Sequence, residues 1–250
     1  MTDLFDMTDK VAIVTGGSRG LGREMVLAFA ARGADVVIAS RKFENCEAVA
    51  EEVRAHGRRA LPIAYHAASW DGAGELAEAA YAEFGKVDVL VNNAGMSPLY
   101  PSVDAISEDL YDKVMGVNLK GPFRLSAIVG TRMAAEDGGS IIFVSSGASQ
   151  RPSDKELVYG AAKAGVNALT YGLARTLGPK VRVYCIVPGP FLTDISKAWD
   201  LEAFNRDATA RFALGRGGEP HEIVGAALYF ATDASTYTTG TTLNVDGGPR

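Results

Sequence analysis

The sequence has little cysteine and no strong excess of either charge. Its 250 residues include only Cys46 and Cys185, too few for a disulfide framework and without the spacing of metal ligands. We therefore expect two small core thiols and no metal site. The formal net charge of −5 argues against nucleic acid and against anionic membrane surfaces, because both are bound through basic faces.

Long hydrophobic runs are also missing. The longest stretch with little charge, residues 157–174, contains Lys163 and many small or polar residues, so it does not predict a membrane span. The first ten residues are acidic and lack the apolar core of a signal peptide. These features predict a cytoplasmic protein.

Short apolar runs alternate with longer helical patterns along the whole chain, and glycine follows several of the predicted helices. This alternation predicts an α/β fold: one Rossmann-like, doubly wound domain over residues 1–250, with a mainly parallel sheet and helices on both faces. Ligands bind such sheets at the carboxyl ends of the strands. The expected strands are 11–15, 36–39, 60–65, 87–91, 140–145, 181–187 and 241–245, and the expected helices are 21–32, 44–56, 74–84, 107–117, 119–135, 156–177 and 219–231.

The first predicted strand leads into a glycine-rich turn, TGGSRGLG, at residues 15–22. Gly16, Gly20 and Gly22 allow a tight turn and a close approach of the backbone to a pyrophosphate. The helix that follows points its free N–H groups at that anion. An ordinary βα turn is the alternative, but the position between a strand and a helix favours a dinucleotide.

The end of the second predicted strand distinguishes the two nicotinamide dinucleotides. NAD sites carry an acidic residue there for the ribose 2′-hydroxyl, whereas this chain has Ser40 and Arg41. Arg41 and Arg19 are suited to pair with a 2′-phosphate, although both are also typical of a solvated surface. We predict NADP(H) as the preferred cofactor, with NAD(H) as the alternative.

Tyr159 and Lys163 lie four residues apart in the longest predicted helix and so share a helix face. A phenol has a pKa of about 10, too high for a base at neutral pH. An ammonium about 4 Å away contributes roughly 4 kcal/mol, or about three pKa units. We therefore expect a general acid/base pair, with Ser146, after the fifth predicted strand, as hydrogen-bond donor to the substrate oxygen.

Taken together, these residues resemble the short-chain dehydrogenase/reductase family of about 250 residues, and the resemblance covers essentially the whole chain. The family's cofactor loop, Asn-Asn-Ala-Gly signature, nicotinamide-side loop and C-terminal signature are matched, in that order, by residues 15–22, 92–95, 188–193 and 245–248.

The resemblance implies a role for each catalytic residue. Tyr159 would be the acid/base, Lys163 would lower its pKa and hold the nicotinamide ribose, Ser146 would orient the carbonyl, and Asn118 would support a water in the proton relay. Asn92, Ala94 and Gly95 would line the adenosine side, and Thr193 with the Phe191 backbone would hold the carboxamide. The full set of expected cofactor-binding residues is Gly16, Ser18, Arg19, Gly20, Leu21, Gly22, Ser40, Arg41, Asn92, Ala94, Gly95, Tyr159, Lys163, Pro188, Gly189, Phe191 and Thr193.

Two positions depart from the family pattern. His66 stands where an aspartate usually follows the third strand, and we expect it to be a solvated loop residue. Tyr184 stands where an asparagine often precedes the Pro-Gly loop, which leaves the local hydrogen bonding open.

Family members are commonly homotetramers, so the resemblance implies a homo-oligomer. It would be built partly through the helix of Tyr159, whose small residues are Gly160, Ala161, Ala164 and Gly165.

Residues 96–103, 147–158 and 190–216 should frame the substrate pocket, the last as a lid. We predict NADP(H)-dependent hydride transfer between a ketone or aldehyde and an alcohol on a small organic substrate. An NAD(H)-dependent sugar or polyol dehydrogenase and a 3-oxoacyl thioester reductase remain open. A catalytically silent dinucleotide sensor or scaffold is the alternative of a different class.

Overall fold

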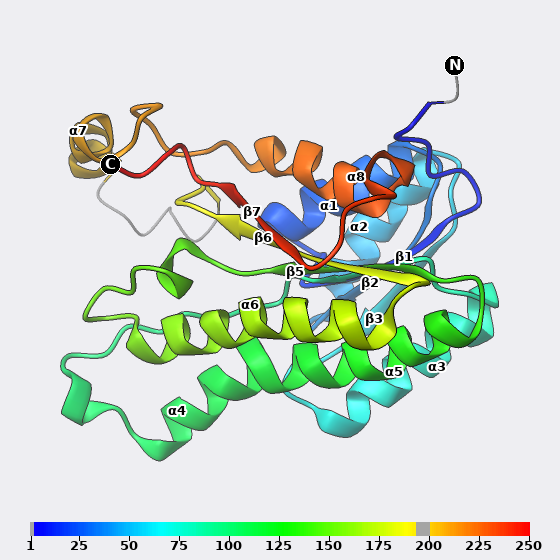
Figure 1. Ribbon diagram of the computed structural model, residues 1–250, viewed down its shortest axis with the longest axis horizontal. Helices are drawn as coiled ribbons and strands as arrows, with labels where there is room; N and C mark the ends of the chain where they lie inside the picture. The colour runs from blue at the N-terminus through cyan, green and yellow to red at the C-terminus, as the bar shows by residue number, and fades with distance from the viewer. Residues whose placement is uncertain (1–2, 194–200) are drawn as a thin grey trace.

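Seven parallel strands form one doubly wound sheet, as predicted, and their order is β3-β2-β1-β4-β5-β6-β7 (Figure 1). The computed structural model describes residues 3–193 and 201–250, so residues 194–200 of the predicted lid lie outside the described residues. The strand order reverses between β1 and β4, which creates the crevice where such sheets bind ligands. The strands are β1 (Val11–Thr15), β2 (Asp35–Ser40), β3 (Ala60–Ala64), β4 (Val89–Asn92), β5 (Gly139–Val144), β6 (Val181–Pro188) and β7 (Thr241–Val245).

Helices cover both faces of the sheet (Figure 1). One face carries α1 (Gly20–Ala31), α2 (Phe43–Ala55) and α8 (Val224–Ala231), and the other carries α3 (Trp70–Phe84), α5 (Gly121–Ala135) and α6 (Leu157–Leu177). Successive residues of a strand point to opposite faces, so Val14 enters the first core and Ile13 the second. Because both faces are buried, the central strands are apolar throughout, which is why they were recognisable in the sequence.

Two predicted helices are joined in the structure. The sequence predicted separate helices over 107–117 and 119–135, whereas α4 (Glu108–Met115) runs through a π-helical turn, Gly116–Lys120, directly into α5. The predicted break therefore coincides with the π-helical turn, which contains Asn118. Such turns are rare and are often found at functional sites.

A further helix, α7 (Leu201–Arg211), lies in the segment predicted only as a lid. Both cysteines are buried and free, as expected. Within residues 3–193 and 201–250, each helix is too short or too polar to cross a membrane. The same residues contain no cluster of metal-ligating side chains.

Candidate active site

The glycine-rich turn after β1 forms a narrow backbone cradle at the start of α1. Gly16 and Gly20 have φ angles of +65° and +51°, which favour glycine. A Cβ on Gly22 would lie 2.2 Å from the carbonyl oxygen of Gly16, so no other residue fits there. The free N–H groups of α1 begin at this cradle, and the residues present therefore fit a pyrophosphate.

The turns after β1 and β4 are tied together by Asn93, which the sequence analysis did not single out. Its side-chain amide donates to the backbone oxygens of Thr15 and Gly16 at 3.0 and 3.2 Å. The Thr15 hydroxyl accepts from the backbone N–H groups of Asn93 and Ala94, both at 3.1 Å. Asn92 instead points into the core and donates to Ser126 at 2.9 Å, so only its backbone can reach the crevice. The alternation of side chains along β4 was the available signal for this difference.

Two arginines lie exposed at the end of the sheet that includes the cradle. Arg19 precedes α1, and Arg41 directly follows β2. Neither makes an ion pair with a residue that the structure describes, whereas the nearby Arg23 pairs with Glu52. Both guanidinium groups therefore keep their full capacity to bind an anion.

The serines of the two turns also meet. Ser18 donates to Ser40 through their hydroxyl groups at 2.9 Å, which joins the cradle to the end of β2. The predicted residues of the phosphate loop and of the second strand are thus close together.

Tyr159, Ser146 and Lys163 come together where β5 ends and α6 begins. Tyr159 is the third residue of α6, and Ser146 follows β5. Lys163 is buried, its Nζ donates to the backbone oxygen of Val144 at 2.7 Å, and it lies 5.7 Å from the centroid of the Tyr159 ring. The predicted acid/base pair therefore shares one site.

The pKa values differ from the expectation for this pair. Burial raises the pKa of Tyr159, and the hydrogen bond with Ser146 opposes this rise only in part. Burial also lowers the pKa of Lys163 to about 8. Lys163 is not among the causes of the Tyr159 shift, so in the chain alone the lowering of the phenol pKa toward 7 by Lys163 stays a prediction.

Asn118 lies fully buried in the π-helical turn and holds the loop after β4. Its Nδ2 donates to the backbone oxygens of Met96 and Val114 at 2.8 and 2.9 Å, and its Oδ1 accepts from the Met96 N–H at 3.2 Å. A Cβ on Gly95 would lie 3.0 Å from that Oδ1 and 3.5 Å from Lys163 Nζ. Gly95 therefore lets two predicted catalytic residues approach the same strand end.

The loop after β6 forms the opposite wall. Pro188 ends β6, and a Cβ on Gly189 would lie 2.7 Å from the Cα of Asp246. The nicotinamide-side loop and the C-terminal signature expected from the family resemblance are therefore in contact. Phe191 is buried, and its carbonyl accepts from the Thr193 N–H at 2.9 Å. The Thr193 methyl would be 3.6 Å from a Cβ on Gly20, which places Thr193 over the phosphate cradle.

A small apolar cavity lies beside the Tyr159 ring. Two of the three segments predicted to frame the substrate, 96–103 and 147–158, contribute to its walls. Its other lining residues are Pro98, Tyr100, Ile106, Leu110, Val114 and Val158.

A search against family models matches residues 10–203 to the short chain dehydrogenase family. L-rhamnose 1-dehydrogenase (NAD(P)+) of Azotobacter vinelandii is 39% identical over 97% of each chain. The 3-oxoacyl-[acyl-carrier-protein] reductase of Thermotoga maritima is 34% identical over 96% of this chain and 97% of its own. A solved 7α-hydroxysteroid dehydrogenase with NADH and a 7-oxo bile acid superposes with a TM-score of 0.94 at 30% identity, covering 100% of this chain and 97% of the other.

The chain belongs to the short-chain dehydrogenase/reductase family. As a member of that family, this dehydrogenase/reductase is an NAD(P)-dependent oxidoreductase that acts on CH–OH groups. The relatives differ in cofactor and substrate, so neither follows from membership alone.

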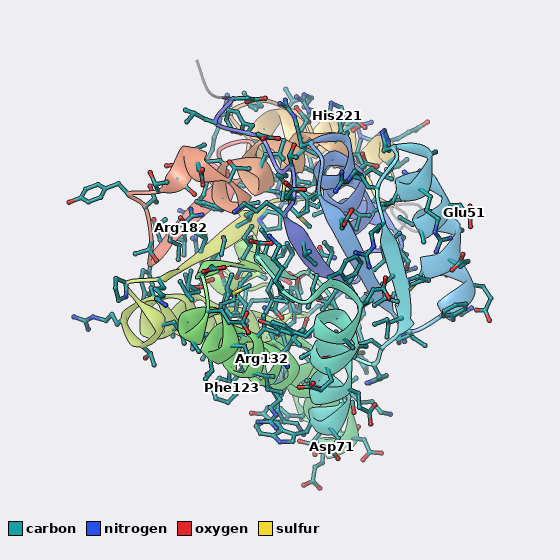
Figure 2. All side chains as sticks on the ribbon, turned by 90° about the vertical axis from the view of Figure 1, so that its right-hand side faces the viewer. Glu51, Asp71, Phe123, Arg132, Arg182 and His221 are labelled. Carbon is teal, nitrogen blue, oxygen red and sulfur yellow. The ribbon has the colours of Figure 1, made fainter. Side chains whose placement is uncertain are left out.

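The structure shows the surroundings of Tyr184 and His66, the two residues that depart from the family pattern. Tyr184 is fully buried, stacks on Phe230 with ring centroids 4.2 Å apart, and donates to the backbone oxygen of Ser235 at 2.9 Å. Arg182, labelled in Figure 2, donates to the Tyr184 hydroxyl at 2.7 Å. Tyr184 is thus a core residue under α8. His66 is exposed, as expected, and accepts from the Ala68 N–H at 3.3 Å.

Two of the four small residues that were expected at a subunit interface on α6 pack within the subunit instead. A Cβ on Gly160 would lie 2.7 Å from the Ala148 carbonyl oxygen, and one on Gly165 would lie 3.0 Å from Leu119. These two glycines allow packing within this subunit, and only Ala161 and Ala164 of the predicted set are exposed.

Proposed function

We propose that this dehydrogenase/reductase interconverts a ketone or aldehyde and an alcohol on a small organic substrate, with NADP(H) as its preferred cofactor. The observation that carries the preference is the pair of exposed arginines, Arg19 and Arg41, beside a cradle that fits a pyrophosphate, with no acidic residue at the end of β2. A 2′-phosphate carries charge that these guanidinium groups would neutralise, whereas a 2′-hydroxyl does not.

The proposed mechanism uses four side chains. The nicotinamide, when bound, supplies or accepts the hydride. Ser146 donates a hydrogen bond to the substrate oxygen, and Tyr159 gives its proton to that oxygen or takes it back. Lys163 supplies positive charge beside Tyr159 and would hold the nicotinamide ribose. Asn118 supports this arrangement by fixing the loop at Met96.

The raised pKa of Tyr159 bears on which proton transfer is ready at neutral pH. A protonated phenol is ready to donate to a carbonyl oxygen, so reduction can begin at once. Oxidation of an alcohol first needs the phenolate. Near pH 7 Tyr159 of the chain alone is therefore protonated, the form that carbonyl reduction uses.

An NAD(H)-dependent sugar or polyol dehydrogenase is the second candidate; the similarity to L-rhamnose 1-dehydrogenase (NAD(P)+) supports its sugar substrate and allows either cofactor. A 3-oxoacyl thioester reductase is supported by the similarity to the Thermotoga maritima reductase. Each candidate needs the same Tyr159 and Ser146, so the catalytic residues do not distinguish them. Substrate trials must do so.

The decisive assay follows nicotinamide absorbance with NADPH, NADH and their oxidised forms. Each is supplied with L-rhamnose, glycerol, a 3-oxoacyl thioester, a 7-oxo steroid and a simple ketone. We expect turnover with NADPH to exceed turnover with NADH, and a clear NADH preference would refute the proposed cofactor. Tyr159→Phe should abolish turnover while keeping NADPH binding. Full turnover in that variant would refute the catalytic role, and no turnover of any probe by the wild type would favour the silent scaffold.

We also propose that residues 1–250 act as one catalytic domain in a cytoplasmic homo-oligomer. The described part of 190–216 would cover the substrate, since its base is closed by backbone hydrogen bonds between Pro190 and Gly218 at 3.0 Å and between Leu192 and Gly218 at 2.8 Å. Light scattering coupled to size exclusion tests the assembly. A monomer at micromolar concentration would contradict it.

A further inference from the structure

The first turn of α6 is held by a side chain from a distant loop. The backbone N–H of Leu157, the first residue of α6, donates to the Tyr100 hydroxyl oxygen at 2.8 Å. The first N–H groups of a helix have no acceptor within the helix, and Glu156 at the N-cap supplies no side-chain cap. Tyr100 therefore acts as the capping acceptor for this helix from 57 residues away.

Tyr100 is well placed to keep this contact. Its side chain is only 8% exposed, so its hydroxyl is sheltered from competing water. Its ring lines the apolar cavity together with Val158 and Tyr159. Tyr100 thus touches the first turn of α6 at its backbone and at the wall beside Tyr159.

The other end of the Tyr100 loop is fixed at a second proposed catalytic residue. Asn118 binds both the N–H and the carbonyl of Met96, four residues before Tyr100. The short segment 96–100 therefore links Asn118 in the π-helical turn to the start of α6. A shift of Tyr159 relative to Asn118 would have to stretch this link.

We propose that Tyr100 is a positioning residue that fixes the first turn of α6, and with it Tyr159, against the loop after β4. This rests on the proposed role of Tyr159 as acid/base. Tyr159 is the third residue of its helix, and helix ends are the parts that open most readily. Proton transfer tolerates little displacement of the reacting groups, so a loosened first turn would slow turnover.

Tyr100→Phe tests the proposal because it removes one oxygen and keeps the ring. The lost hydrogen bond should lower kcat about fivefold, the equivalent of about 1 kcal/mol, on the best substrate of the panel above. KM and the Kd for NADPH should stay within about twofold. Amide hydrogen exchange in peptides covering 157–160 should speed up by about the same fivefold, and this measurement needs no substrate. Tyr171→Phe, at an exposed position farther along α6, is the matched control and should change neither quantity.

Three results would overturn the proposal. They are unchanged kcat and exchange rates in Tyr100→Phe, a rise in KM with kcat unchanged, or faster exchange throughout the chain with a lower Tm instead of faster exchange confined to 157–160. Failure of the proposed function is separate from these, because Tyr159→Phe with full turnover would refute the role of Tyr159 whatever the exchange data show.

Discussion

Lys163 donates from its Nζ to the backbone oxygen of Val144 at 2.7 Å, at the last residue of β5. The ammonium is thereby fixed to the end of the sheet, not to the phenol four residues away. Because a buried cation is costly, the pKa of Lys163 falls to about 8. The position of this charge has consequences for stability as well as for catalysis.

Replacing Lys163 with methionine should change how stability depends on pH. The pKa of Lys163 is about 8 in the folded chain and 10.5 for a solvated lysine in the unfolded chain, so between these values the unfolded chain binds more protons. The free energy of unfolding of the wild type should therefore rise with pH, relative to Lys163→Met, by up to about 1.4 kcal/mol per pH unit in this window. Below pH 8 the difference should level off, with the wild type at its least stable relative to Lys163→Met.

Urea unfolding at several pH values between 7 and 10 measures this difference. The same substitution at the exposed Lys155 is the control. A difference between wild type and Lys163→Met that is constant with pH would contradict the buried-charge interpretation.

Reduction and oxidation should respond to pH in opposite directions. Because the pKa of Tyr159 is raised, carbonyl reduction should stay constant through neutral pH and fall only in the alkaline range, while alcohol oxidation should rise with pH. Ser146→Ala should slow both reactions by about 10²- to 10³-fold. It should also move both profiles to higher pH, since the hydrogen bond with Ser146 lowers the pKa of Tyr159. Profiles of kcat/KM in both directions check this, and a shift to lower pH would contradict it.

The fold, and the proximity of most candidate site residues, followed from short-range patterns in the sequence. Strands such as β1 were recognisable because both of their faces are buried, and the turn at 15–22 because glycine alone fits its backbone. The helix break predicted next to Asn118 falls within a π-helical turn, whose residues do not follow the periodicity of an α-helix. Patterns that depend on one element alone were thus the most readable.

Contacts between distant segments could not be predicted from the sequence. The Lys163 ammonium donates to the Val144 carbonyl, and the first N–H of α6 is capped by Tyr100. In each case the partner comes from another part of the chain. Likewise, Gly160 was predicted to face another subunit but packs on Ala148, because a small residue looks the same whether it meets its own chain or a partner. Such pairings depend on tertiary geometry, which local residue patterns do not encode.

Gly95→Ala should impair catalysis more than stability. The added methyl would lie 3.0 Å from Asn118 Oδ1, so Asn118 must shift by a few tenths of an ångström, whereas the 3.5 Å contact with Lys163 Nζ is an ordinary one. We expect turnover to fall about tenfold or more, with a loss of about 1 kcal/mol in the free energy of unfolding. Gly172→Ala is the matched control: its methyl meets open space on α6 and should stabilise the chain by about 0.5–1 kcal/mol. Normal turnover in Gly95→Ala would show that this contact is not needed.

Arg41→Ala should weaken NADPH binding and leave NADH binding almost unchanged. A hydrogen bond to a charged group contributes about 1.5–3 kcal/mol, so the Kd for NADPH should rise at least about tenfold. Arg54→Ala is the control, since Arg54 is already paired with Glu47 and Glu51. Titration with each dinucleotide at two salt concentrations measures the effect, which should be smaller at high salt. Equal losses for NADPH and NADH would instead place Arg41 at a phosphate that both cofactors share.

Deleting Pro249 and Arg250 should loosen the segment proposed to cover the substrate. The C-terminal residues lie beside the end of α7 (Figure 1), where the Arg250 N–H donates to the Arg211 carbonyl at 2.9 Å and Pro249 bridges Phe212. Losing these contacts should raise KM for the substrate about fivefold, with the Kd for NADPH unchanged. Proteolysis within 201–216 should also become faster. If the shortened chain kept the wild-type KM and cleavage rate, residues 249 and 250 would have no part in holding α7, and the ordering of that helix would have to come from contacts with residues before 249, such as those of Ala213 with Gly248 and Leu214 with Gly247.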